Sequence, residues 1–171
     1  MDLVYLDPPF KSNADYNVLF NAEGLKPDEA QMMVFKDTWY WEGEANQAYT
    51  EIQDLPNPNL VNIINALHQA LGTSPMMAYL AMMALRLHYI RSLMKPSAVM
   101  YLHCDPTASH YLKVILDAIF GPQSYLNEII WRRTGSHNNS GRFGPIHDVI
   151  HFYRKSDKYR HRPVFRPYAK G

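Results

Sequence analysis

The feature that most constrains this chain is a short apolar run, residues 2–6, that stops at Asp7-Pro8-Pro9. Its length and composition are typical of a buried strand. Proline cannot donate to the hydrogen-bond ladder of a sheet, so the strand must end there. A second run of the same kind, residues 98–102, is followed by Asp105-Pro106, a pair that favours the start of a helix. The sequence therefore predicts buried strands that alternate with helices.

The sequence between these two predicted strands contains several signals for helices. Pro27 precedes acidic residues suited to a first helical turn, so we expect a helix from there to about Lys36. Ser74-Pro75 starts the most apolar helix of the chain, which ends at Lys95-Pro96. The remaining predicted elements are helices at 44–55, 59–71 and 107–120, strands at 126–133 and 149–154, and loops at 11–17 and 134–145. This order is that of an α/β fold.

Charge is distributed unevenly along the chain. Residues 1–130 contain 7 Lys and Arg against 14 Asp and Glu, whereas residues 131–171 contain 10 Lys and Arg against 2 Asp. Such polarity predicts a basic segment that faces a polyanion, although a solvated basic face has the same composition. Aromatic residues are interleaved with the basic ones. They favour nucleic acid as the partner, because aromatic rings stack on bases while Lys and Arg neutralise phosphates.

The sequence argues against several other classes of protein. Cys104 is the single cysteine, so disulfides and cysteine metal sites are excluded and a reducing, cytoplasmic location is expected. We expect Cys104 to be a small buried residue and Asp105 to be a helix N-cap. His103 and His110 lack acidic partners at metal-binding spacing, so no metal site is predicted. The start of the chain has no signal-peptide pattern, and the longest apolar stretch, residues 75–94, is too polar for a membrane span.

The tetrapeptide Asp7-Pro8-Pro9-Phe10 suits one kind of chemistry. An exocyclic amine of adenine or cytosine is a poor nucleophile, because its lone pair is delocalised into the ring. A carboxylate and a backbone carbonyl that each accept an N–H bond pull this nitrogen toward tetrahedral geometry. Two prolines stiffen the loop and leave the Pro8 carbonyl free, and an aromatic ring stacks on the flipped base. Ligands of open α/β sheets bind at the carboxyl ends of strands, where this tetrapeptide is predicted.

Three segments resemble site-specific DNA methyltransferases that act on adenine N6 or cytosine N4. They are residues 2–20, 101–113 and 125–133. The resemblance covers essentially the whole chain, and it implies that Asp7, Pro8, Pro9 and Phe10 are catalytic. The catalytic tetrapeptide comes first and a basic segment follows it. This order matches the beta class of the family, in which the cofactor-binding region comes last.

The resemblance implies S-adenosylmethionine as cofactor, but the sequence lacks the family's main loop for it. That loop is a Phe-x-Gly-x-Gly that follows a strand, and none of the eight glycines forms one. We therefore expect residues 1–130 to be the catalytic half of a methyltransferase domain, with a helical insertion at about 25–72. Residues 131–171 would begin the DNA-binding, target-recognition segment. The expected fold is a partial Rossmann-like sheet without its cofactor half.

The resemblance also suggests residues around the catalytic tetrapeptide. Lys11, Ser12, Asn13 and Tyr16 would belong to a substrate-proximal loop, with simple solvent exposure as the alternative. In the basic segment, the side chains suited to phosphates or base edges are Arg132, Arg133, His137, Asn138, Asn139 and Arg142.

Three functions remain open from the sequence. The preferred one is methylation of adenine N6 in DNA by S-adenosylmethionine. Cytosine N4 methylation is the alternative within the family, because Asp-Pro-Pro-Phe favours adenine only statistically. A non-catalytic DNA-binding fragment is the third. Double-stranded DNA is the expected partner, and a restriction subunit is a further one.

Overall fold

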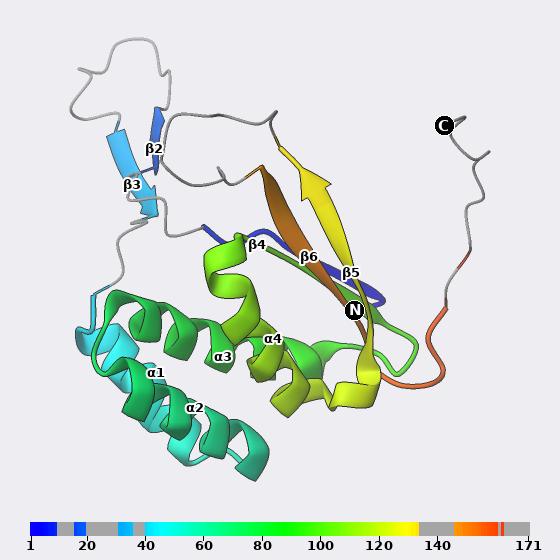
Figure 1. The fold of residues 1–171 in the computed structure, drawn as a ribbon, viewed down its shortest axis with the longest axis horizontal. Coiled ribbons are helices and arrows are strands. Elements are labelled where there is room, and N and C mark those ends of the chain that lie inside the picture. The colour runs from blue at the N-terminus through cyan, green and yellow to red at the C-terminus, as the bar shows by residue number, and fades with distance from the viewer. Residues whose placement is uncertain (10–15, 20–30, 36–39, 134–145, 161, 163–171) are drawn as a thin grey trace.

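A computed structural model describes residues 1–9, 16–19, 31–35, 40–133, 146–160 and 162. Over these residues the chain forms the predicted α/β fold, a four-stranded mixed sheet with four α-helices gathered on one side of it (Figure 1). The strands of this sheet are β1 (Leu3–Leu6), β4 (Val99–Cys104), β5 (Tyr125–Arg132) and β6 (His147–Arg154). The helices are α1 (Gly43–Gln53), α2 (Pro58–Leu71), α3 (Pro75–Leu93), α4 (Pro106–Phe120) and a short 3-10 helix, η1 (Pro122–Ser124).

The sheet has the strand order β1-β4-β6-β5. β1 and β4 are parallel, with Leu3 opposite Val99 and Leu6 opposite Leu102. β6 runs antiparallel to both of its neighbours, β4 and β5. The parallel pair places the carboxyl ends of β1 and β4 at the same end of the sheet, which is where α/β proteins bind their ligands.

The four α-helices begin and end within about two residues of the bounds predicted for them. The Ser74 hydroxyl accepts the Met77 N–H at 3.2 Å, and the Asp105 carboxylate accepts the Ala108 N–H at 2.9 Å. Each cap satisfies one of the N–H groups that a helix start leaves without an internal partner. α2 ends at Gly72, whose φ of 58° is a conformation that glycine adopts without strain. The predicted N-cap role of Asp105 is therefore confirmed.

One predicted helix is wrong. Gln31–Phe35 forms strand β3, which pairs antiparallel with β2 (Tyr16–Leu19) in a separate two-stranded sheet. Valine and phenylalanine favour extended backbone, and pairing across the two strands supplies hydrogen bonds that a helix would otherwise have made internally. Tyr16 and Asn17, which the sequence places in a loop at 11–17, belong to β2, and residues 11–15 lie outside the described residues. The remainder of the predicted helix, residues 27–30 and 36, lies outside the described residues.

The alternation of strand residues gives the sheet two different faces. Met100, Leu102 and Cys104 of β4 are fully buried in the core with the helices, so the expected burial of Cys104 is confirmed. Burial and nearby carboxylates raise the pKa of the Cys104 thiol to about 12. The other face carries the rings of Tyr101 and Phe152, which stack at 4.3 Å. The described helices all lie on the first face (Figure 1).

Candidate active site

Asp7 follows β1 directly, and its side chain is 56% exposed. Its carboxylate oxygen Oδ1 lies 3.3 Å from Nδ1 of His103, near the end of β4. Strand geometry accounts for this approach. The parallel register pairs Leu6 with Leu102, so the next residue of each strand follows as a neighbour. Asp7 and His103 thus emerge side by side at the carboxyl end of the parallel pair.

His103 links Asp7 to a buried carboxylate. Its other ring nitrogen, Nε2, lies 3.3 Å from Oδ2 of Asp148, a residue of β6 whose side chain is only 2% exposed. Oδ1 of Asp148 is 3.2 Å from Nε of Arg133, directly after β5. A buried carboxylate is costly unless cations or donors lie near it, and the Arg133 guanidinium and the His103 ring are the groups beside this one. A continuous series of charged and polar groups therefore crosses the end of the sheet from β5 to β1.

Tyr5 also reaches this cluster. Successive strand residues point to opposite faces, so Tyr5 and Asp7 share the face that the described helices leave free. The Tyr5 hydroxyl lies 3.3 Å from Nδ1 of His103. Desolvation, together with the negative charge of Asp7, raises the pKa of Tyr5, so its hydroxyl keeps its proton. Tyr5 and Asp7 consequently compete for the same nitrogen of His103.

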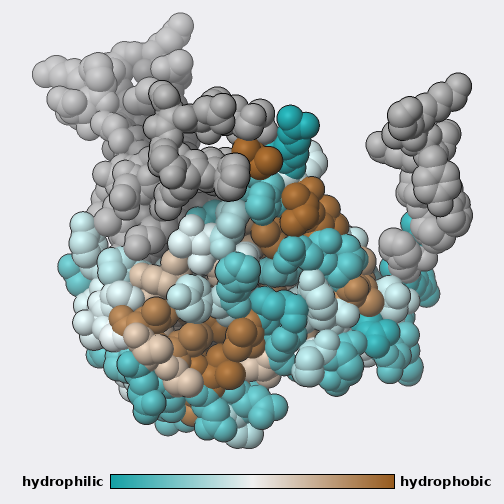
Figure 2. All heavy atoms as spheres, in the orientation of Figure 1, coloured by the Kyte–Doolittle hydropathy of each residue, from teal (hydrophilic) through white to brown (hydrophobic). Residues whose placement is uncertain are grey.

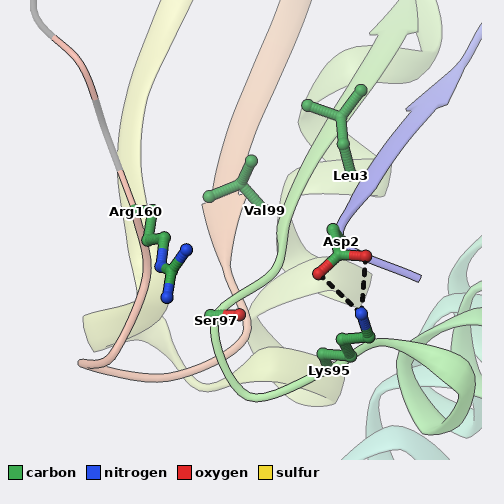
Figure 3. A pocket seen from close by; sticks show the side chains of 6 residues that line it. All are labelled: Asp2, Leu3, Lys95, Ser97, Val99 and Arg160. Carbon is green, nitrogen blue, oxygen red and sulfur yellow. Dashed lines mark hydrogen bonds and ion pairs between the residues drawn. The ribbon is translucent and has the colours of Figure 1, made fainter.

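A separate hollow lies at the opposite end of β1 and β4. Its volume is about 620 Å³, and its lining residues are Asp2, Leu3, Lys95, Ser97, Val99 and Arg160 (Figure 3). The Asp2 carboxylate and the Lys95 ammonium form an ion pair of 2.8 Å there, which lowers the pKa of Asp2. On extended backbone Asp2 and Asp7 are separated by about 16 Å. The hollow is therefore not the site that the tetrapeptide belongs to.

The end of β5 before Arg133 carries exposed apolar, aromatic and basic side chains. Ile130 and Trp131 are 56% and 57% exposed, and Arg132 is exposed as well. Figure 2 shows hydrophobic and hydrophilic residues side by side at this end of the sheet. The structure separates two residues that the sequence treats alike. Arg133 is held by Asp148, whereas Arg132 lies in β5 itself.

Only part of the predicted site falls within the described residues. Asp7, Pro8 and Pro9 are described, and Tyr16 opens β2. The predicted residues that lie outside the described part are Phe10, Lys11, Ser12, Asn13, His137, Asn138, Asn139 and Arg142. Their proposed roles stay predictions.

Sequence reasoning missed three residues of the cluster, namely Tyr5, His103 and Asp148. Tyr5 could have been found from its spacing of two before Asp7. His103 could have been found by setting the two apolar strands in parallel register, because it then falls beside Asp7. Asp148 carried no such signal, since its place depends on β6 lying between β4 and β5.

The described residues do not by themselves fit a binding loop for S-adenosylmethionine. The described glycines are Gly43, Gly72 and Gly121. Gly43 opens α1, and the other two follow the ends of α2 and α4. None of them follows a strand at the end of the sheet that carries Asp7. Over the same described ranges, no group of His, Cys, Asp and Glu could hold a metal ion, and no helix is long and apolar enough to cross a membrane.

Comparison with known proteins gives the same class of protein as the fold and the tetrapeptide. The family model for DNA methylases matches residues 1–170. The type II methyltransferase M.EcaI of Enterobacter cloacae is 34% identical over 95 residues, which is 54% of this chain and 21% of that protein. The Mod subunit of the type III restriction-modification enzyme EcoP15I of Escherichia coli is 21% identical over 90% of this chain and 20% of its own length. The StyLTI Mod subunit of Salmonella typhimurium is 24% identical over 78% and 17%.

The chain belongs to this family of DNA methylases, as the resemblance of its three segments indicated. It spans about a fifth of the length of the curated relatives that it matches.

Proposed function

We propose that this chain is the base-holding half of a DNA methyltransferase that modifies adenine N6. One observation carries the proposal. In a chain of the DNA methylase family, the exposed carboxylate of Asp7 stands at the carboxyl end of a parallel strand and is followed by two prolines. A carboxylate in that place is accessible to a base that has been flipped out of the duplex.

In this proposal Asp7 accepts one N–H of the target amino group, and the carbonyl of Pro8 accepts the other. The two prolines stiffen the loop that presents both acceptors. The two acceptors pull the nitrogen toward tetrahedral geometry and direct its lone pair away from the ring. Phe10 stacks on the face of the flipped base. These roles explain why a carboxylate, two prolines and an aromatic residue occur in sequence.

The methyl group comes from S-adenosylmethionine, which the family uses. Because the described residues do not fit its binding loop, we propose that a cofactor-binding half completes the sheet beside β1. Within the described part of the chain, β1 pairs on one side only, with β4. Leu3 and Tyr5 of this strand are 60% and 53% exposed, which is unusual for the centre of an α/β sheet. Residues 1–130 would then be the catalytic half, and residues 131–171 the start of target recognition.

The substitution Asp7→Ala, made in the enzyme that contains both halves, tests the assignment. We expect methyl transfer to fall by at least about 100-fold, because an acceptor aimed at the reacting nitrogen is lost. DNA affinity should change by less than about threefold. Asp2→Ala is the matched control, since Asp2 lies at the other end of the same strand and pairs with Lys95. Undiminished methylation by the Asp7→Ala enzyme would refute the proposal.

The choice between adenine and cytosine needs a direct chemical measurement. DNA modified by the enzyme is digested to nucleosides, which are separated and weighed by mass spectrometry. We expect N6-methyladenine. Detection of N4-methylcytosine alone would refute adenine as the target while leaving the amino-group chemistry in place.

We further propose that the enzyme acts on double-stranded DNA in the cytoplasm, as the modification component of a restriction system. Two of the relatives described above are Mod subunits of type III restriction-modification enzymes. The test is protection of DNA in cells. Expression of the complete enzyme should make its target sites resistant to the endonuclease of the same system, and unprotected sites would contradict the proposal.

A further inference from the structure

The polar groups behind Asp7 form a graded series of exposure. The side chain of Asp7 is 56% exposed, that of His103 is 12% exposed, and that of Asp148 is 2% exposed. Arg133, at 42%, reaches the buried carboxylate from the β5 side. The exposed Asp7 carboxylate therefore contacts the His103 ring, and the other side of that ring faces the buried Asp148 carboxylate. Such an arrangement holds a side chain that would otherwise rotate freely in solvent.

We infer that His103 is a positioning residue that holds the Asp7 carboxylate for its contact with the target amine, with Asp148 fixing the imidazole from behind. The inference rests on the proposed function, because it assigns Asp7 the role of acceptor. The structural observation is the approach of both ring nitrogens of His103 to carboxylate oxygens, each at 3.3 Å.

The chemistry of imidazole explains why histidine suits this position. A carboxylate only accepts hydrogen bonds, so a ring nitrogen facing one must carry a proton to donate. Oδ2 of Asp148 faces Nε2 at 3.3 Å, while Oδ1 of Asp7 and the Tyr5 hydroxyl both face Nδ1. With its proton, Nδ1 donates to Asp7. Without it, Nδ1 accepts from the Tyr5 hydroxyl, which lies at the same 3.3 Å.

Orientation matters because the acceptor oxygen must meet a particular N–H. Oδ1 of Asp7 is directed to His103 in the structure, which leaves the second oxygen of the carboxylate for the base. Removal of an outer residue that orients a reactive group commonly costs about 10–100-fold in activity. The loss should fall on kcat rather than on DNA binding, since His103 itself touches no DNA in this proposal.

The test compares His103→Ala with His103→Asn in the enzyme that contains the cofactor half. The amide nitrogen of asparagine occupies nearly the position of Nδ1, so it retains a donor to Asp7 while the contact with Asp148 is lost. We expect kcat for methyl transfer to fall by about 10–100-fold in His103→Ala with KM for DNA within about threefold. His103→Asn should recover most of that loss. Thermal melting of both variants shows whether either has lost its fold.

The outcomes separate this inference from the proposed function. Asp7→Ala is measured in parallel. If Asp7→Ala abolishes methylation but His103→Ala keeps kcat within twofold of the unmodified enzyme, the positioning role is refuted and the proposed function stands. If His103→Asn is as defective as His103→Ala although it melts normally, donation to Asp7 is not the role of His103. If Asp7→Ala is fully active, the proposed function itself fails.

Discussion

Arg132 and Arg133 are adjacent in sequence, and both are predicted DNA ligands, yet their surroundings differ. Arg133 lies 3.2 Å from an oxygen of Asp148, whose side chain is almost completely buried. Arg132 belongs to β5, the strand at the edge of the sheet. At the scale of residues, Arg133 therefore has a contact within the fold that accounts for its charge, whereas the DNA contact of Arg132 stays a prediction.

Arg133→Ala should lower the free energy of unfolding by about 1–3 kcal/mol, because it removes the guanidinium that lies beside the buried Asp148 carboxylate. Arg132 is exposed, so Arg132→Ala should change it by no more than about 1 kcal/mol. Urea denaturation of the two variants without DNA measures the difference. With DNA, Arg132→Ala should weaken binding and reduce the salt dependence by about one phosphate contact. If the Arg133→Ala variant has normal stability but binds DNA poorly, Arg133 contributes to DNA binding, as the sequence predicts, and not to stability.

His151 gives a prediction about pH. It is 1% exposed, and its Nε2 donates to the Ser109 carbonyl at 3.1 Å. Burial lowers its pKa below the usual value of about 6.5, although the hydrogen bond to Ser109 and the charge of Glu128 act in the opposite direction. Below pH of about 6.5 the unfolded chain binds a proton that the folded chain does not. Stability should therefore fall as the pH falls below that value.

His151→Gln tests this prediction, because the amide nitrogen of glutamine reaches nearly the position of Nε2 and does not titrate. Urea denaturation between pH 5 and 7.5, as ~0.5-unit steps, gives the free energy of unfolding of both proteins. The advantage of the glutamine variant should grow toward acid, by no more than about 1.4 kcal/mol per pH unit. His88, whose pKa is also lowered by burial, leaves a common slope in both proteins. A difference independent of pH would contradict the prediction.

At the scale of elements, the N-cap of α3 is the clearest local interaction to test. The Ser74 hydroxyl accepts the Met77 N–H at the start of a helix with nine buried residues. Ser74→Ala should lower the free energy of unfolding by about 1 kcal/mol, because this N–H loses its acceptor. Ser74→Asp is the matched control, since it keeps an acceptor there and should be nearly neutral. Equal loss in both variants would show that the cap contributes little.

The helices and strands also show which parts of the fold the sequence can predict. Caps and stops are local signals, so Ser74, Asp105 and Gly72 mark helix boundaries correctly. The sequence predicts a helix at β3 because Pro27 and its acidic neighbours resemble a helix start. The strand forms instead by pairing with β2, which lies earlier in the chain, and no local signal predicts that pairing. The position of Asp7 at the end of a strand is also predictable from a local signal, because the prolines that follow it end the apolar run. Its neighbours His103 and Asp148 come from other strands, and only the sheet order brings them together.

At the scale of the whole molecule, the proposal of two halves predicts what this chain does when isolated. Labelled S-adenosylmethionine titrated into it should show no binding in the micromolar range, whereas duplex DNA should bind with an affinity that falls as salt rises. Adding a cofactor-binding half from the same protein should restore cofactor binding. Micromolar binding by the chain alone would show that it carries a cofactor site of its own.

The pairing of β1 with β4 also has a consequence for how the protein is made. Leu3 of β1 pairs with Val99 of β4, so β1 waits for a partner synthesised 96 residues later. At ordinary rates of translation that interval lasts roughly 5–20 s. Helices α1, α2 and α3 can form during the wait, because their contacts are closer in sequence, whereas the pairing of β1 with β4 joins residues far apart in the chain. The strand that delivers Asp7 therefore leaves the ribosome before β4 and must stay unaggregated until β4 has followed it.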